Sequence, residues 1–216
     1  RKLIPFAYSW GYKALLETAS QLKPRRSELK AKQGLSDDSV VILYCGRLGE
    51  EKALFDLLNA YQLVGNPNKH LAIVGEGNIG QSLRDYATNQ NINSIRFWGF
   101  RKRHEIAEYY ATADVLVLPS RRETWGIVVS EAMCFELPVI VSDQVGAAPD
   151  MVREGENGFT FPTGDIQALA DRIRRVIDLP TAERRKMGLR SAQLMDSWSS
   201  RDLVKSLDQY LDLVHS

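Results

Sequence analysis

Short β-branched apolar runs alternate with amphipathic helical periods from residue 40 onward. Five of these runs are typical of buried strands: Val40–Cys45, Leu71–Val74, Ile95–Trp98, Val115–Leu118 and Val139–Val141. Apolar side chains then recur at helical spacing between the first two runs, at Leu54, Leu57, Leu58, Tyr61 and Val64. A later helix is expected after Asp165, whose side chain can cap its first turn. This alternation predicts an α/β domain with a doubly wound parallel sheet.

The two ends of the chain lack this alternation. We expect residues 1–39 to form an entry segment, with one helix over Arg25–Gln33. The α/β domain should occupy residues 40–180. Helical patterns near Glu183–Met195 and over Leu203–Val214 predict a helical tail across residues 181–216. Because the first residue is Arg1 and no signal pattern follows, the numbering is expected to begin inside a longer polypeptide.

Composition narrows the class of protein. The 216 residues are 44% hydrophobic and 25% charged, which is typical of a soluble globular protein and excludes disorder over most of the chain. A net charge of +1 gives no general attraction to nucleic acid or acidic lipid. No apolar run is long enough to span a bilayer. Cys45 and Cys134 have no C-x-x-C partner, so we expect buried thiols in a reducing, cytoplasmic compartment.

The loop after the first predicted strand carries two cations, Arg47 and Lys52. In an open parallel sheet, ligands bind beyond the carboxyl ends of the strands. Glycines at 46 and 49 allow a close approach of the backbone, and two cations beside a helix N-terminus can hold a phosphate. An exposed loop in which these cations pair with Glu50 and Glu51 fits this segment equally well.

Residues 75–80 spell G-x-G-x-x-G, the pattern of a dinucleotide-binding loop. That loop should follow the first strand and be followed by an acidic residue after the next strand, and neither condition holds here. A tight turn is therefore favoured, although Arg101 could take the phosphate of NADP. The basic run Arg101–Arg103 is either a solvated surface or the border of a nucleotide site, where backbone near Phe100 and Arg101 would read a base.

Two glutamates, Glu123 and Glu131, stand eight residues apart around a predicted helix start near Trp125. Glu123 should lie in the loop, with Glu131 about two turns along the helix. The free N–H groups between them attract a phosphate, and carboxylates accept hydrogen bonds from sugar hydroxyls. This order of groups suits a nucleotide sugar. Alternatively, Glu123 only interacts with the helix dipole and Glu131 is a surface residue.

With these residues in order, the sequence resembles the retaining glycosyltransferases of group 1, or family 4, which have the GT-B fold. The resemblance covers most of residues 25–178. The segments that carry it are Gly46-Arg47 with Lys52, Gly75-Glu76-Gly77, Trp98-Gly99-Phe100, Ala113-Asp114-Val115, Pro119-Ser120, Glu123-x7-Glu131-Ala132, Pro138-Val139-Ile140, Gly146 to Asp150 and Glu156-Asn157-Gly158. The resemblance implies a Rossmann-like domain that is the C-terminal, nucleotide-sugar-binding half of such an enzyme.

The resemblance also implies a role for each candidate residue. Arg47 and Lys52 would hold the donor diphosphate and stabilise the leaving group, and Glu123 would accept hydrogen bonds from the donor sugar. Glu131 would bind the ribose. Backbone near the base, phosphate or sugar would come from Gly46, Arg101, Thr124, Trp125, Gly126, Ile127 and Val128.

Two positions depart from the family pattern. Ala53 stands where a glycine commonly follows the lysine, and Thr124-Trp125 replaces a small residue followed by Phe, which could alter the choice of sugar. No Asp-x-Asp motif for a metal is present. By the resemblance, protein cations serve instead, so no metal and no cofactor are expected.

The sequence therefore predicts a glycosyltransferase donor domain whose partners are a nucleotide-sugar donor and an N-terminal acceptor domain of the same polypeptide. Any peripheral membrane contact is expected to come only through that domain, and no nucleic acid is expected. By itself, the chain is expected to transfer no sugar. The alternatives are an NADP-dependent oxidoreductase and a non-catalytic nucleotide-binding module.

Overall fold

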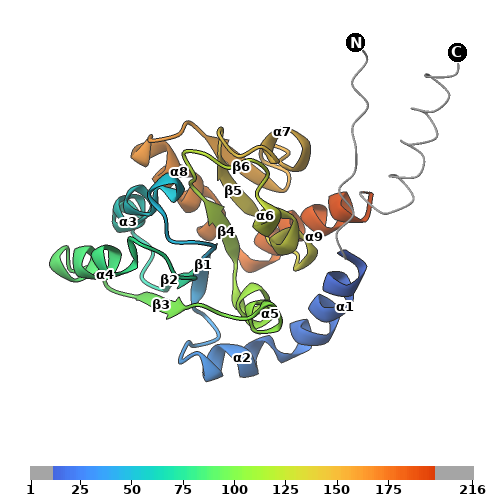
Figure 1. Cartoon of the computed structure of the whole chain (residues 1–216). Coiled ribbons are helices and arrows are strands. Elements are labelled where there is room, and N and C mark those ends of the chain that lie inside the picture. The colour runs from blue at the N-terminus through green and yellow to red at the C-terminus, as the bar shows by residue number, and fades with distance from the viewer. Residues whose placement is uncertain (1–11, 198–216) are drawn as a thin grey trace, which may run out of the picture.

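The computed structural model describes residues 12–197. A six-stranded sheet lies at its centre, with every strand parallel to its neighbours, in the order β3-β2-β1-β4-β5-β6 (Figure 1). The strands are β1 (Val40–Cys45), β2 (Lys69–Val74), β3 (Ile95–Gly99), β4 (Val115–Leu118), β5 (Val139–Ser142) and β6 (Gly158–Phe161). The order reverses between β1 and β4, and open parallel sheets bind ligands beyond the carboxyl ends of the strands at such a reversal.

Helices cover both faces of the sheet. The helical elements are α1 (Tyr12–Leu22), η1 (Lys23–Arg25), α2 (Arg26–Lys32), η2 (Glu50–Lys52), α3 (Leu54–Leu63), α4 (Gly80–Asn89), α5 (Arg103–Thr112), α6 (Ile127–Cys134), α7 (Ala148–Met151), α8 (Ile166–Ile177) and α9 (Thr181–Ser197). One group contains α3, which packs against both α4 and α8. In a second group, α1 contacts α5 and α6, while α9 packs on α6 (Figure 1).

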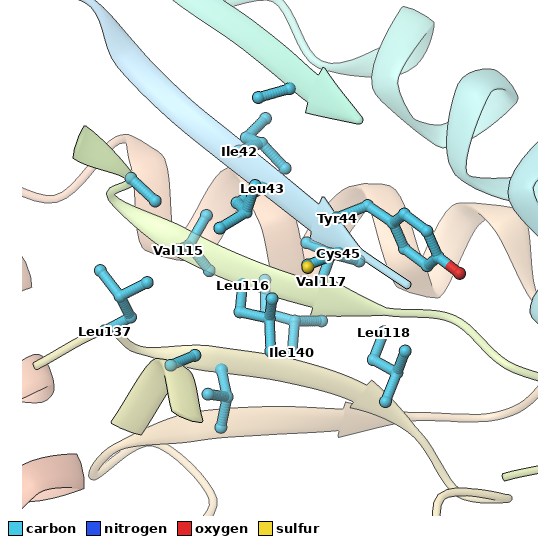
Figure 2. Close-up of a cluster of buried hydrophobic side chains, with 14 of the residues drawn as sticks. Ile42, Leu43, Tyr44, Cys45, Val115, Leu116, Val117, Leu118, Leu137 and Ile140 are labelled. Carbon is cyan, nitrogen blue, oxygen red and sulfur yellow. The ribbon is translucent and has the colours of Figure 1, made fainter. Parts of the chain in front are cut away.

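The core is centred on β1 and β4. Every residue of these two strands is buried, which explains their uninterrupted apolar sequences, because a parallel strand covered on both faces has no solvent side. Figure 2 shows this cluster, with Tyr44 and Cys45 at the carboxyl end of β1 and Leu118 at that of β4. These strand ends therefore give the loops beyond them a rigid base.

Most of the predicted elements are confirmed. The five expected strands and the helices that begin at Leu54 and follow Asp165 are present, and the Asp165 carboxylate accepts a hydrogen bond from the Ala168 N–H at 2.8 Å. The helix expected near residues 25–33 is α2, and α9 contains the one expected at 183–195. The second tail pattern, over residues 203–214, lies outside the described residues.

Strand β6 and helix α1 are among the elements that were not predicted. Strand β6 is only four residues long and begins with a glycine, so it carries a weak strand signal. Helix α1 was missed although its apolar residues recur at helical spacing and pack against the core: Tyr12 is buried, and Leu15, Leu16, Ala19 and Leu22 are partly buried. Within the described residues, no helix is both long and apolar enough to cross a membrane.

A buried charge cluster closes the amino ends of the central strands. Asp114 accepts hydrogen bonds from the Val41 N–H at 2.9 Å and from Arg184 Nε at 3.2 Å, and it forms a 2.9 Å ion pair with Arg26. These partners come from β1, α9 and α2. The cluster thereby joins the segments that precede and follow the sheet to its centre.

Candidate functional site

The loops after β1 and β2 are locked together by close backbone packing. A Cβ atom at Gly75 would lie 1.9 Å from the Gly46 carbonyl oxygen, and one at Gly77 would lie 2.2 Å from that of Leu48. Gly75 also has a φ of +137°, which favours glycine. Gly75 and Gly77, the first two glycines of the G-x-G-x-x-G motif, are therefore required by contacts between loops, so the tight-turn interpretation is favoured over the NADP one.

Arg47 projects from the β1–α3 loop into solvent, and 66% of its side chain is exposed. Its guanidinium forms a 2.5 Å ion pair with Glu51, four residues later. The Tyr44 hydroxyl, buried at the end of β1, donates to the Arg47 carbonyl at 2.8 Å and so fixes the loop backbone. The alternative of an ion-paired loop is thus confirmed for Arg47 but not for Lys52. An exposed pair of this kind contributes about 0–1 kcal/mol, so Arg47 can exchange partners at little cost.

Lys52 does not pair with the neighbouring glutamates but with Glu123, in the loop after β4. The Lys52 ammonium lies 2.5 Å from a Glu123 carboxylate oxygen, and only 15% and 19% of the two side chains are exposed. Ala53, next in sequence, has a φ of +52°. This left-handed conformation explains why a glycine is common after the lysine in the family that the sequence resembles. The pair joins two residues that are 71 positions apart in the sequence.

A short bridge holds Glu123 against the loop that follows β5. Glu123 pairs with Val145 as a parallel β-bridge, and its carbonyl accepts from the Gly146 N–H at 3.0 Å. A Cβ atom at Gly146 would lie 2.0 Å from the Thr124 carbonyl oxygen, so a larger residue would push the two loops apart. The backbone around Glu123 is therefore fixed even though it lies outside any helix.

The helix after Glu123 begins later than the sequence suggests. Helix α6 starts at Ile127, preceded by Gly126 with a φ of +95°, so Trp125 lies outside the helix. Glu131 consequently lies about one turn into α6 instead of two. The prediction of the helix start was wrong because Gly126 adopts a left-handed conformation that breaks the helical path before Ile127. Thr124 and Ile127 are exposed beside this start, and Val128 is half-buried.

Glu131 is half-buried, which contradicts the interpretation of this glutamate as a surface residue. One of its carboxylate oxygens accepts a hydrogen bond from the Tyr110 hydroxyl at 3.0 Å. Burial raises the pKa of Glu131, while the Tyr110 hydroxyl and the positive charge of Arg103 act in the opposite direction. Glu131 is thus a half-buried carboxylate of α6 that a buried tyrosine hydroxyl contacts.

Arg101 is less mobile than a run of surface charges would suggest. It is half-buried after β3, and its guanidinium lies 6.0 Å from the centre of the Tyr109 ring, a cation–π distance. Phe100, directly before it, is 67% exposed. The segment therefore presents an exposed ring and an ordered cation near the carboxyl edge of the sheet.

The structure thus brings Lys52 and Glu123 into direct contact, while Arg47 pairs elsewhere. Two tyrosines that contact this site, Tyr44 and Tyr110, were not singled out from the sequence, because each lies in an apolar pattern typical of core residues. Cys45 and Cys134 are buried free thiols, as predicted, and burial raises the pKa of each to about 12. Across residues 12–197, no cluster of three side chains suited to binding a metal is found.

The strand order and the linked pair of loops define a Rossmann-like half of a GT-B enzyme. The family model for group 1 glycosyl transferases matches residues 25–193. The chain therefore belongs to the group 1 glycosyltransferase family, in the position of its C-terminal domain.

Curated relatives support this assignment. The chain is 32% identical to a sulfoquinovosyl transferase from Arabidopsis thaliana over 140 residues, 63% of this chain and 26% of that protein. It is also 32% identical to a glycogen synthase from Mycobacterium tuberculosis over 148 residues, 67% of this chain and 36% of that protein. The chain thus spans only a minor part of these relatives.

Solved structures show the same fold. A sucrose-phosphate synthase from Thermosynechococcus elongatus matches with a TM-score of 0.76 and 26% identity, covering 99% of this chain and 52% of that one. The Anabaena protein HepE, solved with UDP and glucose, matches with a TM-score of 0.74 and 25% identity over 89% of this chain and 52% of that one.

Proposed function

We propose that this chain supplies the donor site of a retaining glycosyltransferase that uses a nucleotide diphosphate sugar. The observation that carries the proposal is the 2.5 Å contact between Lys52 and Glu123 beside the start of α6. One group suits a phosphate and the other a sugar hydroxyl, and they meet where the two parts of a nucleotide sugar join. HepE, a structural relative, was solved with UDP and glucose.

The cations can reach a diphosphate without dismantling the site. A lysine ammonium has three N–H donors, so Lys52 can keep its contact with Glu123 and still donate to a phosphate oxygen. Arg47 must exchange Glu51 for phosphate, and the weakness of that exposed pair permits the exchange. In this proposal the two side chains supply the positive charge, so no metal and no cofactor are required.

The other contacts follow from the course of the chain. The Val129 N–H donates to the Gly126 carbonyl at 2.9 Å, which leaves the N–H groups of Ile127 and Val128, at the start of α6, to bind an anion. The backbone from Thr124 to Val128 leads from Glu123 to that helix. Glu131 would accept hydrogen bonds from the ribose, and backbone at Gly46 and Arg101 would approach the phosphate and the base. Exposed Thr124 and half-buried Trp125 would border the sugar.

Transfer requires that the bond between the sugar anomeric carbon and the diphosphate oxygen breaks while a bond from that carbon to an acceptor hydroxyl forms. Negative charge grows on the departing diphosphate, and Lys52 and Arg47 stabilise it most in the transition state. Glu123 orients the sugar as it gains positive character. The acceptor hydroxyl gives up its proton to the departing diphosphate oxygen, and an N-terminal domain of the same polypeptide would hold the acceptor.

Titration calorimetry tests this assignment. UDP and GDP are titrated into the protein beside NADP, first with the native sequence and then with Lys52→Ala and with Arg121→Ala. Arg121 is a matched control because it is a cation at the same edge, paired with Asp56 at 2.9 Å. We expect binding of a nucleoside diphosphate that Lys52→Ala weakens and Arg121→Ala leaves unchanged, and no sugar transfer by this chain alone. Binding of NADP alone, or turnover by this chain with any acceptor, would contradict the proposal.

A further inference from the structure

Tyr110 contacts Glu131 but has no part in the proposed function. Its ring is buried on α5, and its hydroxyl donates to Glu131 on α6 at 3.0 Å. This is the one hydrogen bond to the Glu131 side chain found among the described residues. The second carboxylate oxygen therefore remains available to a ligand.

The position of the Tyr110 hydroxyl is fixed by its surroundings. The ring stacks on Phe135, with centroids 5.4 Å apart and planes 28° from parallel. Its hydroxyl lies near Cys45 as well as Glu131. A buried, stacked ring has one available orientation, so the donor cannot follow a displaced carboxylate.

The ionised form of Glu131 depends on the hydrogen bond from Tyr110. Half-buried carboxylates are destabilised in the charged form, and burial accordingly raises the pKa of Glu131. The charged and titratable groups that face it are Arg103 and Tyr110 on α5, Cys45 on β1 and Cys134 on α6. Both thiols stay neutral near pH 7 because burial raises the pKa of each to about 12. Tyr110 and Arg103 are thus the groups that favour the ionised carboxylate.

We infer that Tyr110 is a positioning residue for nucleotide recognition: its hydroxyl fixes one oxygen of Glu131 so that the other can accept a ribose hydroxyl. The inference rests on the proposed function, because it takes the ribose as the ligand of Glu131. Tyr110 itself does not contact the donor.

The first test needs no ligand. Removing the Tyr110 hydroxyl by Tyr110→Phe should raise the pKa of Glu131 further, measured from the carboxyl carbon chemical shift during an NMR pH titration. Tyr61→Phe is the matched control, since Tyr61 is also buried and its hydroxyl donates to the carbonyls of Lys69 and Ser94. The control should leave the pKa unchanged. An unchanged pKa in Tyr110→Phe would overturn the inference.

The second test measures recognition of ribose. UDP and GDP are each titrated beside their 2′,3′-dideoxy forms, and the ratio of affinities gives the preference for ribose. Tyr110→Phe should lower this preference about tenfold, the effect of losing one hydrogen bond to a charged group. Tyr61→Phe should leave it unchanged, and Tyr110→Phe should add nothing further in a protein that already carries Glu131→Gln.

The outcomes separate the inference from the proposed function. If Glu131→Gln keeps the preference for ribose, the ribose assignment is wrong and the inference falls with it. If Glu131→Gln loses the preference while Tyr110→Phe keeps it, the inference alone is overturned. A loss of affinity in Tyr110→Phe that is equal for the ribose and dideoxy forms would show a structural role, which also overturns it.

Discussion

Ion pairs lie at both edges of the sheet, but the hydrogen-bonding groups of the charged side chains have more protein partners at one edge than at the other. At the amino edge, Asp114 is 10% exposed in its side chain and receives donors from Val41, Arg26 and Arg184. At the carboxyl edge, the Lys52–Glu123 pair is more exposed, and each member has hydrogen-bonding capacity that no described protein group uses. Charged residues at the amino edge therefore hold the fold together, whereas those at the carboxyl edge remain available to a ligand.

The difference shows how a binding site can be distinguished from a structural cluster of similar charge. A cavity of about 650 Å³ lies at the amino edge, lined by Arg26, Lys30 and Arg184 among others. Yet the Lys30 ammonium donates to the carbonyls of Ser39 at 2.6 Å and Asp37 at 3.0 Å, and the two arginines bind backbone carbonyls as well as Asp114. The cations that line this cavity already have protein partners, so the cavity is not evidence for a ligand site. A search for cavities alone would therefore have chosen the wrong edge.

The largest expected effect is on stability. Asp114→Ala leaves two arginines without their carboxylate, and breaking a buried pair in this way costs about 3–5 kcal/mol of unfolding free energy. Urea denaturation measures the loss, and Asp171→Ala, which removes the exposed pair with Arg174, serves as the control. The affinity of the folded fraction for a nucleoside diphosphate should stay unchanged. A stability loss no larger than that of the control would remove the distinction between the edges.

The next effect is on catalysis at the carboxyl edge. In the complete enzyme, Arg47→Ala or Lys52→Ala should lower kcat by roughly 10²–10³, the scale for removing one donor to a developing negative charge. Because that charge grows toward the transition state, kcat should fall more than KM rises. Steady-state kinetics with Arg121→Ala as the control measures this. Unchanged kcat in both variants would refute the diphosphate assignment.

The sequence predicted the sheet well because buried parallel strands are continuous apolar runs. It predicted the site less completely. Lys52 and Glu123 could each be chosen from the loops, but their contact depends on the β1–β4 reversal and on the Glu123–Val145 bridge, which join distant segments. The start of α6 was misplaced because Gly126 has a φ of +95°, and a Cβ atom there would lie 3.1 Å from Val145 and 3.2 Å from Leu118, contacts that come from other strands and loops.

The role of Asp114 was also invisible in the sequence. Asp114 belongs to a segment that carries the family resemblance, but its charged partners come from α2 and α9, far away in the chain. Tyr110 was likewise hidden in an apolar helical pattern. A residue that acts by holding another side chain in place cannot be identified from sequence spacing, because tertiary packing determines which residue it contacts.

Substitution of the two glutamates should change different kinetic parameters. Glu131→Gln weakens a contact with ribose, which does not react, so it should raise KM and the Kd for a nucleoside diphosphate about tenfold. Glu123→Gln should lower kcat by roughly 10–10² while that Kd stays nearly unchanged, because the amide oxygen can still accept from Lys52. Calorimetry with the free diphosphate decides between them. If Glu123→Gln loses affinity as badly as Glu131→Gln, the direction of the donor along α6 is reversed.

The smallest expected effect is a pH dependence of stability caused by Glu131. Burial raises its folded pKa above the ordinary value of 4.5, so the folded state holds the proton more tightly than the unfolded state does. The stability that this group contributes is therefore present below about pH 4.5 and is lost as the pH rises through the folded pKa. Compared with Glu131→Gln, whose side chain does not ionise, the native protein should lose thermal stability across that interval. Melting temperatures of both proteins from pH 4 to 8 measure the difference. A native protein that instead gains stability relative to Glu131→Gln would mean that Tyr110 and Arg103 outweigh burial at this carboxylate.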